Sequence, residues 1–292
     1  MRWLVVISII VIWMWNLSHQ NSNFHPNIGY YFWTTKCKIP KDFKYTPYVK
    51  ILDVSYQNKL SIIKTECSCT KKIVPVVYID NFALKKISLN HLEKIIKSEL
   101  KKYKFKKIQF DCDWTNKTRA KYFRLLNYFK NYNTEATIRL HQVKYFKQTG
   151  VPPVKKGILM FYNMSDFENP DTKNYILNLY VAKKYMTNFD KYPLKLDIAL
   201  PHYSQATIIR YGEVVGLVEG IKAKDLDKTF VHISQNRYKV LITHYFKGHL
   251  FYKDDIVRVD EVTPIMIKKS IKLLKKHIRN RIENIVYFRY SN

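Results

Sequence analysis

The chain has 292 residues, of which 47% are hydrophobic and 15% aromatic, so it can bury a large core and is not intrinsically disordered. The net charge is +28, but the lysines are spread over almost every polar segment, and no zinc-finger, RNA-recognition or basic-zipper pattern accompanies them. A solvated lysine-rich surface therefore explains the charge better than nucleic-acid binding does, and it is compatible with attraction to an anionic lipid or polysaccharide.

The N-terminal segment has the pattern of an export signal. Arg2 is followed by an apolar run from Trp3 to Trp15, which suits a signal peptide and is short for a bilayer span of about 20 residues. No small-x-small cleavage motif follows. We therefore predict a signal peptide or membrane anchor at 1–20, with residues 3–17 as the tether. The protein is then exported, either periplasmic or at the cell surface; a buried helix is the alternative.

Beyond a linker at 21–28, strand-like segments mostly alternate with helical ones over a single domain at 29–292. Strands are predicted at 29–35, 48–56, 73–80, 106–115, 135–142, 156–164, 194–201 and 284–290, and helices at 88–103, 117–132, 171–186 and 264–283. Eight such strands in this length predict a (β/α)8 TIM-type barrel, irregular in its first half where 56–72 is not convincingly helical. Neither the Rossmann nor the P-loop fingerprint occurs, and we predict no cofactor and no metal site.

A long segment, about 203–262, separates the seventh and eighth predicted strands. It alternates apolar and polar residues, which predicts an antiparallel β-unit leaving the top of the barrel. There it would form a wall over the pocket, with His244 and Tyr245 as candidate contacts. A cap that stabilises the barrel, or a dimer surface, is an equally good interpretation.

The strand at 106–115 raises the question of function. Its apolar residues share one face, while Asp111 and Asp113 share the other. The polar face of such a strand points into a barrel, and the aspartates lie at its C-terminal end, where barrel enzymes keep their active sites. We therefore expect Asp111 and Asp113 to line a pocket at the barrel mouth, with Asp197 facing them from another strand. A buried ion-pair network of Asp111 with Arg139 or Arg289 is the alternative.

The motifs "FDCDWT", "YFRLLNYFK", "TIRLHQ", "ILMFYNMSDF" and "LKLDIALP" resemble a bacterial domain-of-unknown-function family with a glycoside-hydrolase-like barrel. The resemblance spans most of 29–204 and the last strand, and it implies that fold. Asp111-x-Asp113 is also similar, more distantly, to the Asp-x-Asp-x-Glu strand of chitinase-type enzymes. Thr115 stands here where those enzymes have the acidic glutamate, so their mechanism does not carry over.

Glycosidases use two carboxyl groups, one protonated and one ionised. Asp111 and Asp113 would lie about 6.6 Å apart along a strand, close enough to influence each other's pKa. We assign Asp113 as the acid, Asp111 as the ionised carboxylate, and Asp197 as a reserve partner. The residues expected to bind substrate are Trp33, Trp114, Arg139, His141, Tyr162 and Arg289.

The sequence thus favours a barrel that binds a carbohydrate or other anionic polymer and hydrolyses a glycan. The missing glutamate at Thr115 keeps a non-catalytic binding protein as the alternative. Export would permit a disulfide from Cys37 to Cys67 or Cys69, whereas Cys112 is expected to be a small buried residue.

Overall fold

The structure is a computed structural model that describes residues 24–68 and 72–290. The predicted signal or anchor and Cys69 lie outside these ranges. Cys37 and Cys67 are direct partners in the parallel pair β2 (Lys36–Lys38) and β5 (Glu66–Ser68), and Cys112 is buried as expected. Within the described part of the chain, no helix is long and apolar enough to cross a bilayer.

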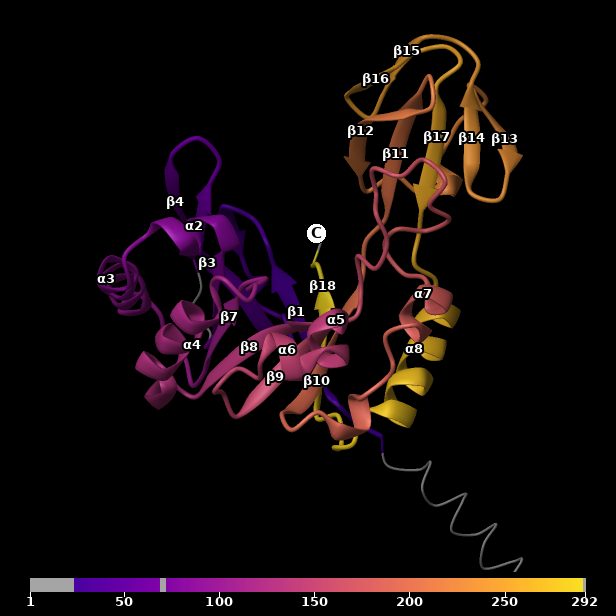
Figure 1. Ribbon diagram of the computed structural model, residues 1–292. Coiled ribbons are helices and arrows are strands. Elements are labelled where there is room, and N and C mark those ends of the chain that lie inside the picture. Colours follow the sequence, from indigo (N-terminus) through magenta and orange to yellow (C-terminus); the bar gives the residue numbers. More distant parts are fainter. Residues whose placement is uncertain (1–23, 69–71, 291–292) are drawn as a thin grey trace, which may run out of the picture.

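Eight parallel strands form a closed barrel, which confirms the predicted fold class (Figure 1). They are β1 (Asn27–Phe32), β3 (Thr46–Tyr56), β6 (Val74–Ile79), β7 (Ile108–Asp111), β8 (Thr134–Arg139), β9 (Lys156–Met160), β10 (Lys195–Pro201) and β18 (Asn284–Phe288). Each strand pairs with the next one, and β1 pairs with both β18 and β3, so the sheet has no break. All eight C-terminal ends therefore meet at one end of the barrel, called the mouth below.

The four predicted helices are shorter than expected, and three further short helices, α2, α5 and α6, were not predicted. The helices are α2 (Asn81–Lys86), α3 (Leu89–Leu100), α4 (Arg119–Tyr128), α5 (Leu140–Lys144), α6 (Phe146–Thr149), α7 (Leu179–Lys183) and α8 (Pro264–His277). The first half is irregular as expected, since the antiparallel strand β4 (Leu60–Lys64) and β5 stand between β3 and β6. The predicted helix at 171–186 is mostly wrong, because Asn174 accepts backbone N–H bonds from Ile176 and Leu177, a local alternative to helix.

In β7, apolar side chains face the helices and polar side chains face the barrel interior, as predicted from their alternation. Ile108, Phe110 and Cys112 join the core between strands and helices, while Gln109 points inward and accepts a 2.7 Å bond from the Tyr31 hydroxyl. In β18 the apolar residues face inward instead. Val286 belongs to the interior cluster and Phe288 packs against it, whereas Tyr287 packs outside against the Tyr30 ring, 5.3 Å away.

The insert between β10 and β18 is a separate antiparallel sheet, as predicted. Its strands, in the order β12-β11-β17-β14-β13, are Glu213–Glu219, Gln205–Arg210, Ile256–Asp260, Arg237–Val240 and Phe230–Ser234. A hairpin of β15 (His244–Phe246) and β16 (His249–Phe251) covers the end farthest from the barrel (Figure 1). The insert has its own apolar cluster, so it can hold its shape apart from the barrel core.

Opposite the mouth, the barrel interior is closed by ion pairs. Lys107 pairs with Glu135 at 2.6 Å and donates to the Tyr48 hydroxyl, and Lys156 pairs with Asp197 at 3.1 Å. Asp197 is fully buried and also accepts the backbone N–H groups of Glu283 and Asn284, just where β18 begins. Asp197 therefore ties the start of β18 to β10 and lies at the wrong end of the barrel to face Asp111.

Replacing Asp197 should destabilise the fold. Asp197→Ala removes the buried partner of Lys156 and the acceptor of the Glu283 and Asn284 N–H groups, and breaking a buried ion pair costs about 3–5 kcal/mol. Urea unfolding of the variant should show this loss. The exposed neighbour Lys195→Ala is the matched control, with an expected change within about 0.5 kcal/mol. Equal stabilities of the two variants would contradict this role for Asp197.

Candidate functional site

Asp111 ends β7 inside the mouth and is almost completely buried. Its carboxylate accepts a 2.7 Å hydrogen bond from the Thr137 hydroxyl on β8. Burial, and to a lesser extent the nearby charge of Asp113, raises the pKa of Asp111 to about 6, although Thr137 and Arg139 act in the opposite direction. Near neutral pH, Asp111 can therefore hold a proton and release it.

Asp113 has the opposite environment. It lies two residues further on, and about half of its side chain is exposed. The Arg139 guanidinium donates to both of its oxygens, from Nε at 2.7 Å and from Nη2 at 2.8 Å. A two-pronged bond of this kind requires the ionised carboxylate and fixes its orientation. The alternative of an ion pair between Asp111 and Arg139 or Arg289 is therefore wrong, because Arg139 pairs with Asp113 and Arg289 pairs with Glu219.

The mouth also contains a third carboxylate, Asp53, which was not identified from the sequence. Asp53 lies beside Tyr78 on the neighbouring strand, and Tyr78 in turn lies beside Asp111. Lys50 pairs with Asp53 at 2.7 Å and places its ammonium 5.0 Å from the Trp33 ring centre. Simple alternation puts residues three apart on opposite faces, but the pairing of β3 with β6 shifts between Lys50 and Leu52. The irregularity lets Lys50 and Asp53 make contact.

Aromatic rings line one side of the mouth. Trp33 is only half-buried and meets Tyr78 and Phe288 edge-on, at 5.9 and 5.5 Å. Tyr162 is buried and stacks on Phe288 at 5.1 Å, and burial raises the pKa of its hydroxyl. Trp33 thus remains available to contact a ligand, whereas Tyr162 mainly supports Phe288.

Trp114 does not belong to this surface. It is 2% exposed, stacks on Tyr122 at 5.3 Å, and donates from Nε1 to the Thr149 carbonyl at 3.0 Å. The expectation that it binds substrate is therefore wrong. As β7 ends at Asp111, the chain turns toward α4, and this turn points Trp114 into the helical layer.

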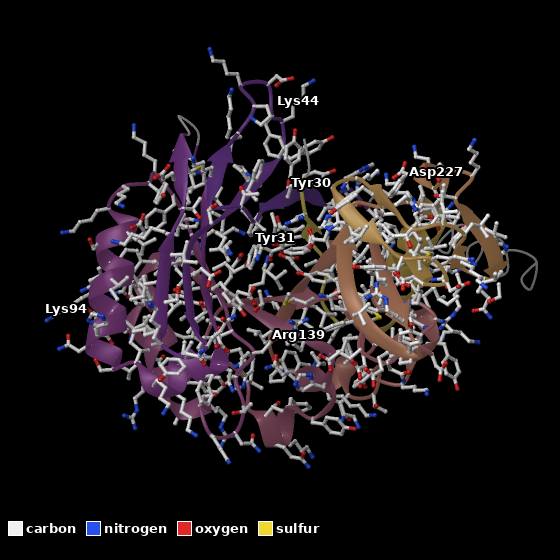
Figure 2. All side chains as sticks on the ribbon, turned by 90° about the horizontal axis from the view of Figure 1, so that it is seen from above. Tyr30, Tyr31, Lys44, Lys94, Arg139 and Asp227 are labelled. Atoms are coloured by element: carbon white, nitrogen blue, oxygen red, sulfur yellow. The ribbon has the colours of Figure 1, made fainter. Side chains whose placement is uncertain are left out.

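His141 and Arg289 lie at the rim. His141 begins α5 rather than ending a strand, and it is exposed; loss of hydration lowers its pKa despite the charge of Asp113. Arg289 follows β18 and forms an ion pair with Glu219 of the insert. In a view turned from that of Figure 1, Tyr31 and Arg139 lie toward the centre of the molecule, while Lys44 and Lys94 lie at its edge (Figure 2).

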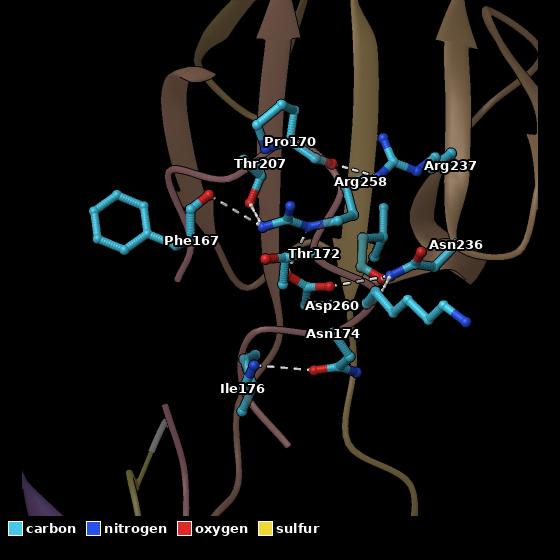
Figure 3. Close-up of polar contacts among 12 residues, drawn as sticks. Phe167, Pro170, Thr172, Asn174, Ile176, Thr207, Asn236, Arg237, Arg258 and Asp260 are labelled. Atoms are coloured by element: carbon cyan, nitrogen blue, oxygen red, sulfur yellow. Dashed lines mark hydrogen bonds and ion pairs between the residues drawn. The ribbon is translucent and has the colours of Figure 1, made fainter. Parts of the chain in front are cut away.

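A buried arginine fastens the insert to the loop that follows β9. Arg258 is fully buried and pairs with Asp260 at 3.1 Å (Figure 3). Its guanidinium also donates to the Thr207 hydroxyl and to the carbonyl of Asn169, both at 3.1 Å. Thr207 lies in the insert and Asn169 in the loop, so Arg258 links the insert sheet to the loop, together with the bonds from Asn236 and Arg237 to the loop carbonyls.

The candidate contacts at the tip of the insert are wrong. His244 bonds to Thr229 and to the Ile242 carbonyl, both at 2.8 Å and both within the insert, and β15 lies at its far end (Figure 1). A pocket of about 1050 Å³ lies instead at the base of the insert, between β10, β18 and α8. Glu219 and Arg289 line this pocket, but Asp111 and Asp113 do not.

No group of three potential metal ligands occurs among residues 24–68 and 72–290. The mouth therefore offers a set of protein groups: one buried carboxyl of raised pKa, one ionised carboxylate, a lysine–aspartate pair and exposed aromatic surface. This combination suits a neutral or charged hydroxylated ligand, since polar groups fix orientation while rings provide contact area.

The fold is a closed (β/α)8 barrel of the TIM type. The structure is similar to the C-terminal domain of a candidate chitinase from Desulfitobacterium hafniense DCB-2, with a TM-score of 0.58, 11% identity, and coverage of 91% of this chain and 94% of that one. It is also similar to the spore cortex-lytic enzyme SleL of Bacillus cereus, with a TM-score of 0.53, 12% identity, and 91% and 71% coverage.

A chitinase from Chromobacterium violaceum ATCC 12472 shares the fold as well, with a TM-score of 0.52, 8% identity, and 90% and 94% coverage. No protein-family model matches the sequence, and no curated protein matches it. At these identities the similarity establishes the fold, and the reaction has to be argued from the side chains.

Because the pKa of Asp111 is raised, we expect the difference in stability between the wild type and Asp111→Asn to depend on pH. In the unfolded chain its pKa is about 3.9, so the protonated form is favoured in the folded state. The associated stability is fully present below pH 4 and is lost as the pH rises through about 6. Asp111→Asn does not titrate. Relative to the wild type, its free energy of unfolding should therefore increase by about 3 kcal/mol between pH 3.5 and 7.5.

Urea unfolding across this range measures the difference, and carboxyl groups distant from Asp111 cancel between the two proteins. Asp190→Asn, at an exposed position, is the control and should show no such trend. A constant difference between the wild type and Asp111→Asn would mean that Asp111 titrates normally.

Proposed function

We propose that the barrel mouth binds and hydrolyses a glycan. The observation that carries this proposal is the pair of aspartates on one strand with opposite environments, Asp111 buried beside a hydroxyl and Asp113 exposed beside a guanidinium. Glycoside hydrolysis needs this division between a protonated and an ionised carboxyl group. The similar solved structures include chitinases and a spore cortex-lytic enzyme, which supports a glycan as ligand.

The electrostatics favour roles opposite to those assigned from the sequence. Asp111 gives its proton to the glycosidic oxygen of the leaving sugar, and the Asp113 carboxylate stabilises the positive charge that develops at the anomeric carbon. Water then adds to that carbon and returns a proton to Asp111. Arg139 orients Asp113 through two hydrogen bonds, while Trp33 offers a flat surface for a sugar ring.

The insert would form one wall of the binding site. It leaves β10 at the mouth, and Arg258 fixes it to the loop after β9. The Glu219–Arg289 ion pair and the pocket beside it would then contact sugars beyond the hydrolysed bond. Hydrolysis of an extracellular glycan would require export, in line with the apolar N-terminal run.

Activity should depend on both aspartates. Release of reducing sugars from chitin oligosaccharides and from spore cortex material is the measurement. Asp111→Asn and Asp113→Asn should each lower the rate by at least about a hundredfold, because general acid catalysis alone contributes 10²–10⁴-fold. Asp190→Asn, at an exposed position on the short helix before β10, should leave it unchanged. Full activity in a folded Asp111→Asn protein would exclude Asp111 as the general acid.

A non-catalytic glycan-binding protein is the second candidate. Thr115 occupies the position of the catalytic glutamate in the chitinase-type motif, and it is exposed, with its hydroxyl 3.4 Å from that of Thr118. Calorimetry would then detect binding of chitin oligosaccharides, dependent on Trp33, without any released product.

Thr115→Glu is a sharper test of this position. A carboxyl group there adds a proton donor near the mouth, so the rate of hydrolysis should rise by at least about tenfold over the wild type. Thr115→Gln is the matched control, because it has the same shape without an acid. Equal rates for the two variants would show that position 115 is not directed at the glycosidic bond.

A further inference from the structure

Basic residues surround the end of the barrel opposite the mouth. Six of the eight strands have an exposed lysine or arginine at their first residue or within three residues before it. This basic ring consists of Lys44, Lys72, Lys106, Lys155, Lys195 and Arg281. Because the strands are parallel, all six residues lie at the same end, which we call the N-terminal end.

Acidic residues collect at the mouth instead. Asp53 and Asp80 lie near or just after the ends of β3 and β6, and Asp111 and Asp113 lie where β7 ends. Two basic residues at the mouth are paired with these acids, Lys50 with Asp53 and Arg139 with Asp113. The charge is thus sorted along the barrel axis.

The acids at the N-terminal end do not cancel the ring. Glu135 and Asp197 are buried and already paired with Lys107 and Lys156. Glu283 is also paired with Lys156, and the positive charges of Lys156 and its neighbours lower its pKa. Asp42 and Asp190 remain as exposed acids near this end, fewer than the six bases.

Two further features lie at the N-terminal end. Helix α8 runs back from the mouth, so its last turn brings Lys275 and Lys276 to this end, and no acidic residue occurs between Pro264 and Ile282. Phe24, which leads into β1, lies 4.5 Å from the Lys275 ammonium, measured to the ring centre.

We infer that the N-terminal end of the barrel binds an anionic phospholipid bilayer, with the mouth directed away from it. Lysines near an anionic lipid surface each favour binding by about 1 kcal/mol, or about fivefold. This inference does not depend on whether the mouth is catalytic.

The test uses the full chain and compares partitioning into two kinds of vesicle by sedimentation. One is phosphatidylcholine alone, and the other contains about one-third phosphatidylglycerol as the anionic lipid. Apolar insertion contributes to both partition coefficients, so their ratio measures only the preference for the anionic vesicles. The ring variant carries Lys106→Gln, Lys155→Gln and Lys195→Gln. The control carries Lys224→Gln, Lys228→Gln and Lys253→Gln at exposed positions of the insert, and it removes the same charge.

The ring variant should lower this ratio by about a hundredfold, from about fivefold for each of three lysines, while the control lowers it much less. Equal losses in both variants would mean that only the net charge matters, and no loss in either would exclude the ring. A short DNA duplex bound by the wild type but not by the ring variant, without preference for anionic vesicles, would identify a nucleic-acid surface and overturn the inference.

Discussion

Closure of the parallel sheet through β1 is the constraint on which the rest of the structure depends. β1 pairs with β18 on one side and with β3 on the other, and only this double pairing brings all strand ends together. Gly29 makes the close approach feasible, since a Cβ there would lie 2.9 Å from the Tyr48 ring and 3.0 Å from the Thr46 carbonyl oxygen. A side chain at this position would push β1 away from β3 and open the barrel.

Closure also forces polar residues into an interior that excludes water. Toward the N-terminal end the cost is offset by pairing, as with Lys107 and Glu135, because each buried charge meets its opposite. At the mouth the compensation is incomplete. Asp111 has a hydroxyl partner but no direct cation, so its charged form is disfavoured. An incompletely compensated carboxyl in an otherwise paired interior is typical of a group kept for its chemistry.

The sequence predicted which residues share a face more reliably than how far along the barrel they lie. Alternation placed the inward face of β7 correctly, and it also placed Asp197 inside the barrel. Height along the axis depends on the stagger between strands, which a single sequence does not reveal. Asp197, near the start of β10, therefore closes the N-terminal end, although its type and face suggested a partner for Asp111.

Local irregularities account for the other errors. An irregularity in β3 brings Lys50 and Asp53 together against the expected alternation, and the turn after β7 redirects Trp114 into the helical layer. Arg289 forms an ion pair with the insert, and such long-range pairing leaves no trace in nearby sequence. The insert itself was predictable, because its alternation is regular and its length exceeds that of an ordinary connection.

The different environments of the two aspartates follow from the pairing of β7 with β8. Phe110 lies opposite Ala136, so Asp111 comes next to Thr137, and Asp113 comes next to Arg139 two residues later. The same period of two that puts both aspartates on the inward face thus gives one a neutral donor and the other a cation. A slip of β8 by one residue would turn Thr137 and Arg139 toward the helices and remove both partners together. The register of a single strand pair therefore determines that Asp111 is the carboxyl group with the raised pKa.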